Sequence, residues 1–414
     1  MLRRTLKAGL ALLLAAAPLA ALAFTQVDLL PRASGGHFPA YPADPTPLYS
    51  VYVQYGAMYD SNILRRSFGD NHDFVQRIGT GGTYTQRVIG RQSVHLEGRL
   101  DGYIYDHYSD LDNIGWSGLG EWRWEVGNDL AGILGVSRRK YQASPSETQR
   151  AAQDPITVTR YTATGGWIVG PTVRLHAGSE YVDYQRPAAG GAELKTLIGF
   201  VGADYITNLG NTLGVEYRQT HGDAPVNVLI DPTGQFGGNQ FTQRDAMLTT
   251  GWIFSPQWRL TGRVGRTTRT YDQLPDRNFS GPTWRAAVDW LPGYKTTMTF
   301  ETYKEISSII DIIASHVVIR GVAFGPGWAP TAKLAFSLRA FRNHQTFVDT
   351  PGAALGTAPA HEEIVRGIRL GAFWEVQRHV DVTLAIDHGE RESNFIGRNF
   401  RYNAFVGNIR YTWY

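Results

Sequence analysis

Three arginines recur along one short stretch of the chain, WRLTGRVGRTTRTY at residues 258–271. Arg259, Arg263 and Arg269 are separated by even-numbered steps, so on an extended strand their side chains lie on the same face. A guanidinium group binds a carboxylate or a phosphate through two parallel hydrogen bonds. If this stretch is a strand, the row offers a surface for acidic polar molecules such as acidic saccharides.

Residue types used in catalysis occur, but not at the spacings that catalysis requires. His361-Glu362-Glu363 would need a second histidine at position 365 to complete the zinc motif HExxH, and that residue is Val365. Ser315 and His316 are neighbours in an expected strand, so their side chains would point to opposite faces. The segment GPGWAPTAK at 325–333 lacks the GK[ST] ending of a phosphate-binding loop. The sequence therefore predicts neither an enzyme nor a bound cofactor.

Acidic side chains gather in the segment YDHYSDLDN. Asp106, Asp110 and Asp112 could offer carboxylate oxygens to calcium, but their spacing is not that of an EF-hand. The chain has no cysteine, which excludes a thiolate metal site and a disulfide scaffold. A solvated loop is the favoured interpretation, with divalent-ion bridging to lipopolysaccharide as the alternative. No resident metal is predicted.

Apolar and polar residues alternate along most of the chain after Tyr49. The alternation is clearest at 94–104, 114–126, 258–264 and 380–387. A period of two is typical of strands that have one apolar and one polar face. The chain is therefore predicted to be all-β.

The lengths of the connections distinguish a membrane barrel from a soluble sandwich. Short turns are expected at 89–91, 126–129, 169–172, 207–211, 255–257, 291–295, 329–332 and 377–379. Longer polar connections alternate with them, at 60–73, 106–113, 143–156, 186–195, 221–241, 272–281, 306–313, 346–362 and 389–398. Because outer-membrane barrels have short periplasmic turns and long extracellular loops, this predicts a transmembrane antiparallel β-barrel of 18 strands in the bacterial outer membrane. The alternation is blurred near 73–88 and 313–326, so 16 strands is the alternative.

Aromatic residues agree with a membrane barrel. Ten tryptophans fall on the apolar phase, mostly near expected strand ends, where aromatic girdles meet the two lipid interfaces. They are Trp116, Trp122, Trp124, Trp167, Trp252, Trp258, Trp284, Trp290, Trp374 and Trp413. Core packing is an equal explanation for any one of them. The last strand ends GNIRYTWY, which resembles the C-terminal signal of outer-membrane barrels.

The polar phase of the strands is expected to face the interior. Eighteen strands spaced about 4.8 Å apart and tilted about 40° give a backbone diameter of roughly 36 Å, which is wide enough for water. The charged residues predicted to line this pore are Arg99, Asp101, Arg123, Arg259, Arg263, Arg269, Arg285, Asp289, Arg339, Arg369, Glu375 and Asp387. Together they suit an acidic saccharide. Ordinary charge compensation inside a wide barrel is the simpler explanation for any single one.

The first residues differ from the rest of the chain. Residues 1–23 have the charged start, apolar run and Ala21-Leu22-Ala23 exit of a secretory signal peptide, and the apolar run is too short for a spanning helix. Residues 24–48 form a proline-rich periplasmic linker, and 49–414 form the barrel. Three basic residues of the signal peptide account for the net charge of +3, so the mature chain is neutral and no nucleic-acid partner is predicted.

Four segments of the chain resemble one known family. They are YDSNILRRS (59–67), FTQRDAMLTTGW (241–252), RTYDQLPDRNFSGPTWRAAVDW (269–290) and RGVAFGPGWAPTAKLAFSLRA (320–340). These segments are similar to the EpsL-like outer-membrane proteins of exosortase-associated exopolysaccharide gene clusters, which lie within a broader group of β-barrel porins. The resemblance implies a role in passing exopolysaccharide across the outer membrane. It implies no catalytic or binding residues.

The leading expectation is a conduit, or part of one, for exopolysaccharide export. Its expected partners are outer-membrane lipid, lipopolysaccharide, the polysaccharide and periplasmic export proteins. A general diffusion porin and a non-conducting assembly or anchoring protein are the alternatives. The connection 221–241 is the longest and carries several apolar residues, so we expect it to fold over or into the pore. Packing against neighbouring loops is the alternative for this segment.

Overall fold

The computed structural model describes residues 48–188, 192–224, 228–229, 236–237, 239–307, 316–348 and 361–414. The predicted signal peptide and nearly all of the predicted linker lie outside these residues, and both stay predictions. Within the described part of the chain, no helix is long and apolar enough to cross a membrane.

Strands make up most of the described chain. The 18 strands of the main sheet are β1 (Tyr49–Asp60), β2 (Asp73–Arg87), β3 (Ser93–Tyr105), β4 (Asn113–Val126), β5 (Leu130–Gln142), β6 (Pro155–Val169), β7 (Val173–Arg186), β8 (Ala192–Ile206), β9 (Thr212–Asp223), β12 (Phe241–Ser255), β13 (Trp258–Tyr271), β14 (Phe279–Gly293), β15 (Thr296–Ser307), β16 (His316–Trp328), β17 (Leu334–Val348), β18 (His361–Gln377), β19 (Val380–Ser393) and β20 (Phe400–Trp413). A separate two-stranded sheet pairs β10 (Val228–Leu229) with β11 (Phe236–Gly237). The described helical turns are η3 (Ser109–Leu111), α2 (Pro145–Thr148) and η4 (Pro275–Arg277).

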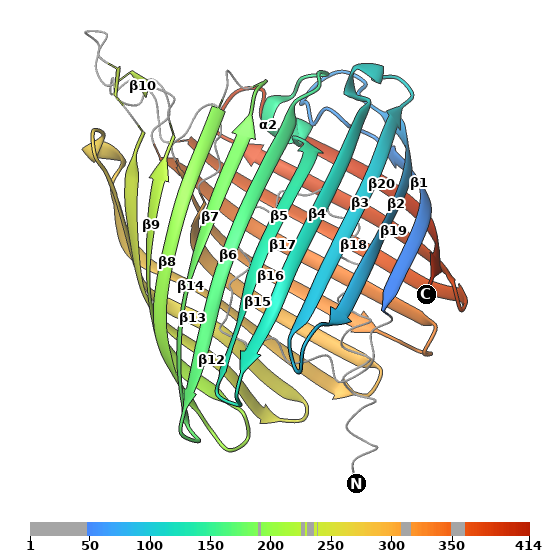
Figure 1. The fold of residues 1–414 in the computed structure, drawn as a ribbon. Coiled ribbons are helices and arrows are strands. Elements are labelled where there is room, and N and C mark those ends of the chain that lie inside the picture. The colour runs from blue at the N-terminus through green and yellow to red at the C-terminus, as the bar shows by residue number, and fades with distance from the viewer. Residues whose placement is uncertain are drawn as a thin grey trace.

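The main sheet closes into a barrel (Figure 1). Neighbouring strands pair antiparallel, β9 pairs with β12 across the connection that carries β10 and β11, and β1 pairs with β20. The closing register sets Val51 opposite Trp413 and Asp60 opposite Ala404. A closed barrel leaves no unpaired sheet edge, which is the condition for strands to cross a membrane.

Tight turns join the strands at one end of the barrel, and the longer connections lie at the other. Gly90, Gly127, Gly170 and Gly210 lie in four of these turns with φ between 57° and 78°, a conformation that glycine adopts without strain. Both short turns and long connections fall where the alternation predicted them. The 18-strand prediction is confirmed, and the 16-strand alternative is wrong.

Interior glycines explain why the alternation is blurred in β2. Gly79 and Gly81 face the interior, and large side chains of neighbouring strands lie over them. A Cβ atom at Gly79 would lie 2.2 Å from Oδ1 of Asp101, and one at Gly81 would lie 2.6 Å from the hydroxyl of Tyr52. The missing side chains therefore make room for polar groups of β1 and β3.

Apolar residues on the interior face explain the blurred alternation in β16. Val317 and Ile319 are buried in a small cluster with Tyr303 and Phe347. The interior face of this part of β16 is apolar like its outer face, so the sequence shows no alternation there.

Exposed apolar side chains form the outer face of the barrel. Leu100, Val322 and Leu384 are 49%, 55% and 56% exposed. Asp101, which follows Leu100 and points to the interior, is 5% exposed. The ten tryptophans singled out in the sequence share the outer phase by register. A barrel that is apolar outside and polar inside is built to be surrounded by lipid.

A buried cluster lies under the long connections of the first strands. Met58, Leu64, Val75 and Leu111 belong to it, and Leu64 is fully buried. The carboxylate of Asp73 accepts hydrogen bonds from the backbone N–H groups of the residues at 106, 107 and 108, at 3.1, 3.0 and 3.2 Å. The connections of the first strands are therefore packed against one another over this cluster.

Candidate functional site

All twelve residues predicted to line the lumen fall on the interior phase. The register sets Arg263 opposite Arg285 and aligns Arg339, Arg369 and Asp387 across three neighbouring strands. The structure thus brings the twelve to one surface, although they belong to several separate clusters. Their contribution to a conducting path stays a prediction.

Asp101 is the centre of one cluster, on β1–β3 and β20. Its carboxylate accepts hydrogen bonds from Gln54 Nε2 and Arg77 Nε, each 2.9 Å long, and from Nε of Arg99. Arg410 Nη2 donates to the amide oxygen of Gln54 at 3.0 Å. This network holds three guanidinium groups and one carboxylate, so it is positively charged.

Glu301 and Glu305 organise a second cluster, on β13–β17. Glu305 accepts hydrogen bonds from Arg263 Nη2 at 2.5 Å and from Arg285 Nε and Nη2 at 3.1 and 2.5 Å. Glu301 binds Arg285 and lies 3.6 Å from Arg339 Nη2. Three predicted arginines therefore meet through two glutamates that the sequence analysis missed. Both glutamates lie on the interior phase of β15, so the alternation of the sequence was sufficient to find them.

Two more predicted positions form compact pairs. Arg369 binds Asp387 on the adjacent strand, with Nε at 3.2 Å from Oδ2. Arg123 Nη2 lies 3.0 Å from Glu121 Oε2, two residues away on the same strand. Each pair neutralises itself, so these residues fit the charge-compensation explanation.

The remaining predicted residues near the short turns have fewer partners. Asp289 accepts a 2.7 Å hydrogen bond from the hydroxyl of Thr299. Arg259 lies opposite Asp289 in register, and Glu375 lies opposite Asp381. The side chains of Arg259 and Glu375 have no hydrogen-bond or salt-bridge partner among the residues that the structure describes.

Guanidinium groups lie over aromatic rings at several places around the interior wall. The pairs, with distances from Cζ to the ring centroid, are Arg410 over Tyr52 (4.3 Å), Arg139 over Tyr141 (5.0 Å), Arg218 over Phe200 (5.5 Å), Arg269 over Phe241 (4.3 Å) and Arg285 over Tyr303 (4.6 Å). A cation–π contact of this kind holds each guanidinium near the wall. The wall therefore presents a repeated combination of planar ring and hydrogen-bond donor.

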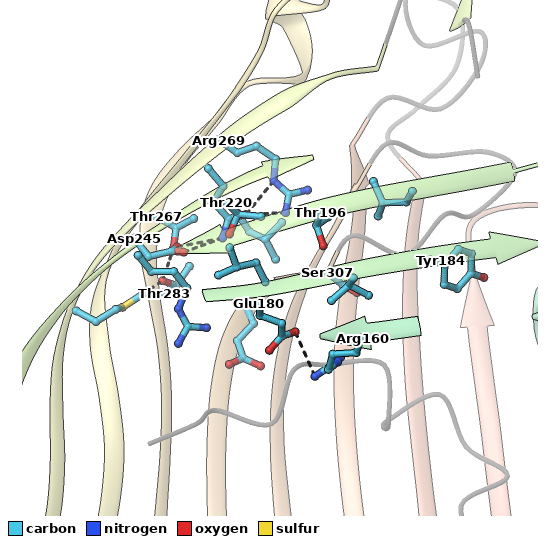
Figure 2. Close-up of a pocket in the computed structure, with 18 of the residues that line it drawn as sticks. Arg160, Glu180, Tyr184, Thr196, Thr220, Asp245, Thr267, Arg269, Thr283 and Ser307 are labelled. Carbon is cyan, nitrogen blue, oxygen red and sulfur yellow. Dashed lines mark hydrogen bonds and ion pairs between the residues drawn. The ribbon is translucent and has the colours of Figure 1, made fainter. Parts of the chain in front are cut away.

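A cavity of about 1470 Å³, open to solvent, lies against the interior face of β5–β9 and β12–β15. Hydroxyl groups line much of it, from Thr196, Thr220, Thr267, Thr283 and Ser307 (Figure 2). Several of its charged groups have polar partners: Arg160 Nη1 lies 3.3 Å from Glu180, and the hydroxyl of Thr267 donates to Asp245 at 2.5 Å (Figure 2). The described cavity thus offers many hydrogen bonds without a single dominant charge.

A further interior group escaped the sequence analysis. His176 lies between two carboxylates, with Nδ1 3.1 Å from Asp204 Oδ2 and Nε2 3.6 Å from Glu216 Oε2. Arg174 Nη2 binds the same Asp204 at 2.7 Å. Alternation alone puts these residues on the interior phase, but their contact depends on the register between strands. No described nucleophile lies within hydrogen-bonding distance of His176, so the arrangement is an ionic network rather than a catalytic pair.

The connection predicted only as a long loop at 143–156 comprises residues 143–154 in the structure, and it covers part of the mouth. Arg186, which is 1% exposed, fixes its base: Nη1 lies 2.7 Å from Glu147 Oε2 and Nη2 lies 2.7 Å from Asp154 Oδ2. Ser144 caps the short helix α2 by accepting a hydrogen bond from the backbone N–H of Ser146. We call residues 143–154 the α2 loop.

The tip of the α2 loop is held by distant parts of the chain. Arg391 Nη1, on β19, donates to the carbonyl oxygen of Ser146 at 2.9 Å. Gln149 Nε2 donates to the carbonyl oxygens of Arg65 and Gly397, at 2.7 and 3.1 Å. Since β19 lies six strands from β5 around the barrel, the loop extends across the opening. Among the residues that the structure describes, the α2 loop is the candidate for a constriction of the lumen.

The loop expected to gate the pore, 221–241, lies largely outside the described residues. The structure describes Val228–Leu229 and Phe236–Gly237 as a short hairpin, seen beside β9 in Figure 1. The gating hypothesis for this segment stays a prediction.

The motifs considered for catalysis have structural partners. His361 begins β18, and its Nε2 lies 2.9 Å from Glu363 Oε1, while its ring stacks on Phe347. His316 Nδ1 lies 3.0 Å from the hydroxyl of Tyr271, and Ser315 is outside the described residues. In the described ranges, no group of three or more histidine or acidic side chains is placed to hold a metal ion.

Known proteins give a partial comparison. A family model described as "Putative beta-barrel porin 2" matches residues 244–412, and no curated protein matches the chain. Solved structures of similar fold include Pseudomonas aeruginosa OpdK with vanillate, at 14% identity over 88% of this chain and 99% of that one, with a TM-score of 0.49. P. aeruginosa OccK2 (OpdF) in complex with glucuronate is 13% identical over 88% and 98%, with a TM-score of 0.48. The alcaligin outer-membrane receptor FauA of Bordetella pertussis is 11% identical over 89% and 76%, with a TM-score of 0.45.

The fold, the apolar outer face and the family match define the class of protein. The chain is a β-barrel of the bacterial outer membrane with porin-like architecture.

Proposed function

We propose that this barrel is a conduit, or part of one, through which an exopolysaccharide crosses the outer membrane. The proposal includes no catalytic step and no cofactor. The four segments that resemble EpsL-like proteins suggest this substrate class. The periplasmic export proteins that would deliver the polymer belong to the proposal as well.

The repeated placement of arginine over aromatic rings is the observation that carries the proposal. Arg285 over Tyr303 and Arg410 over Tyr52 lie on different sides of the interior wall, and each offers a flat face beside hydrogen-bond donors. A sugar ring has an apolar face and an equatorial set of hydroxyls, so it can contact both parts at once. Many such weak contacts let a polymer slide, because no single contact has to be strong.

A general diffusion porin is the second candidate. By register, the interior face of the 18 strands carries as many acidic as basic side chains, which favours weak selectivity. The two functions differ in what they predict for a bound polymer. A third candidate, an assembly or anchoring protein, predicts no steady conductance.

Single-channel recording in planar bilayers tests the proposal. We expect an acidic oligosaccharide, such as an oligoglucuronate, to cause longer current blockades than a neutral dextran oligomer of the same length. Arg285→Gln should shorten the blockades, while Arg366→Gln on the outer face should not. Equal, brief effects of both oligomers on a large conductance would replace the proposal with a diffusion porin. Absence of any conductance would replace it with an anchoring role.

A further inference from the structure

The outer face of β15–β18 changes sharply from apolar to basic. On β17, Leu334, Phe336, Leu338 and Ala340 face outward from the short-turn end, and the next outward residue is Arg342. Six residues at about 3.3 Å each give an apolar run of roughly 20 Å along the strand. Because the strand is tilted by about 40°, this run spans roughly 15 Å of the membrane's thickness, so the apolar band is short on this face and the positive charge begins at its border on the side of the long connections.

Basic residues lie directly opposite each other in this region. Lys304 is the register partner of Arg320, and Arg342 is the register partner of Arg366. Directly opposed like charges on one face of a sheet are destabilising, because their Cβ atoms are only about 5 Å apart. Such an arrangement is stable when an anion lies between the charges.

Only some of these cations have protein partners. Arg366 is neutralised by Glu390 and Glu392, at 2.9 and 2.6 Å. The side chains of Arg320 and Arg342 have no hydrogen bond or ion pair with any part of the chain that the structure describes. Lys304 has no carboxylate partner there either; its Nζ lies 5.8 and 5.9 Å from the rings of Phe279 and Trp284.

An apolar groove adjoins these cations on the same face. Phe300, Val322, Phe324 and Ile368 line it, with Arg342 at its border. A ligand that fits both features has an anionic head and a hydrocarbon chain, and the groove opens to the lipid rather than to water.

Cations on the other side of the barrel do not form such a site. Arg138 lies over the ring of Trp116 at 5.8 Å, and Lys195 Nζ lies 3.3 Å from Glu193 Oε1. Lys140, Arg244 and Arg266 on the outer face also lack a carboxylate partner among the described residues, but none of them has a basic register partner. Directly opposed cations on the described outer face are thus confined to β15–β18. This difference argues against a uniform belt of solubilising charge.

We propose that Lys304, Arg320 and Arg342 bind the phosphate groups of lipid A, the membrane anchor of lipopolysaccharide, and that the adjoining groove holds one of its acyl chains. A diphosphorylated disaccharide can contact cations on several neighbouring strands at once. A cation near a membrane surface strengthens the binding of an anionic lipid. The site is independent of what passes through the lumen.

Native mass spectrometry of the detergent-solubilised barrel with added lipid A tests this site. The test variant is Lys304→Gln/Arg320→Gln/Arg342→Gln, and the matched control is Arg138→Gln/Lys140→Gln/Lys195→Gln, which removes the same charge from the other side of the outer face. We expect the test variant to bind diphosphorylated lipid A at least about tenfold more weakly. The control should bind it as the parent does.

Three results would overturn the proposal. One is equal binding of lipid A by the test and control variants. Another is equal binding of phosphate-free lipid A by the parent, which would make the groove alone responsible. The third is a stable dimer or trimer that the test variant dissociates, which would assign this face to a second copy of the chain. Heat-shifted migration on gels checks that both variants are folded.

Discussion

Arg391 on β19 donates a 2.9 Å hydrogen bond to the backbone carbonyl of Ser146, which belongs to a loop that leaves the barrel six strands away. A contact between such distant parts of the wall is possible only because the α2 loop folds inward across the mouth. Among the described residues, the α2 loop therefore narrows the opening relative to the backbone diameter of the wall.

Releasing the α2 loop should widen the channel. In Arg186→Gln, Glu147 and Asp154 lose the cation that neutralises them, and leaving a buried charge without its partner costs about 3–5 kcal/mol. We expect the loop to leave the mouth, and single-channel conductance in planar bilayers to rise. Arg123→Gln is the matched control, because it removes an interior arginine that touches no loop residue. A conductance that is unchanged in Arg186→Gln would show that the α2 loop is not the constriction.

One glycine on the outer face is expected to be intolerant of a side chain. A Cβ atom at Gly132 would lie 2.2 Å from the carbonyl oxygen of Thr164 and 2.5 Å from the ring of Trp124. Gly132→Ala should therefore displace that ring and destabilise the barrel by about 1–3 kcal/mol. Gly98→Ala is the control, because its Cβ would have nothing within 4 Å. Urea unfolding in lipid vesicles measures both, and equal midpoints would contradict the prediction.

The fold was readable from the sequence because two local signals agree. Alternation marks each strand, and the lengths of the connections mark which end of the barrel each one joins. The signal weakened only where the interior needed glycine, as at Gly79 and Gly81, or apolar packing, as at Val317. In these places the demands of a neighbouring strand override the pattern of the strand itself.

The site was readable only in part. Alternation put Arg263 and Arg285 on the interior phase, but their meeting at Glu305 depends on the register of three strands. The anchors of the α2 loop depend on contacts between residues more than 240 positions apart, such as Ser146 and Arg391. Nothing local encodes such contacts, so a loop that folds inward looks the same in the sequence as a solvated one.

The two faces of the wall should respond differently to the same new charge. Leu100 is on the outer face of β3, where an arginine at mid-membrane costs roughly 2–4 kcal/mol. Thr162 faces the interior of β6 opposite Glu180, where an arginine finds water and a carboxylate. We expect Leu100→Arg to reduce the yield of folded barrel in a liposome assay and Thr162→Arg to leave it unchanged. Equal yields would mean that the inside and outside of this part of the wall are misassigned. Asp101 is a poor choice for such a control, because three side chains donate hydrogen bonds to its carboxylate.

Ion selectivity should depend on the glutamates of β15. Glu305 neutralises Arg263 and Arg285 at distances down to 2.5 Å, in the wall of the described cavity. In Glu305→Gln, Arg263 loses its carboxylate partner and Arg285 keeps only Glu301, so this part of the wall gains positive charge that attracts anions. The permeability ratio of chloride to potassium should therefore rise, by roughly twofold for a wide channel in which one charge pair changes. The measurement is the reversal potential across a planar bilayer that separates two salt concentrations.

The control for this prediction is a glutamate that also binds two arginines but lies on the outer face of the barrel. Glu390 binds Arg366 and Arg401 on the outer face, at 2.9 and 2.8 Å, where permeating ions do not pass. Glu390→Gln changes the net charge of the protein by the same amount and should leave the reversal potential where it was. The effect of Glu305→Gln should also weaken as salt is raised, because screening shortens the reach of the two arginines to about 3 Å at 1 M. If both variants shift the potential equally, net charge and not the lumen sets the selectivity. If neither shifts it, ions do not pass along β13–β15, and the conducting path lies elsewhere in the barrel.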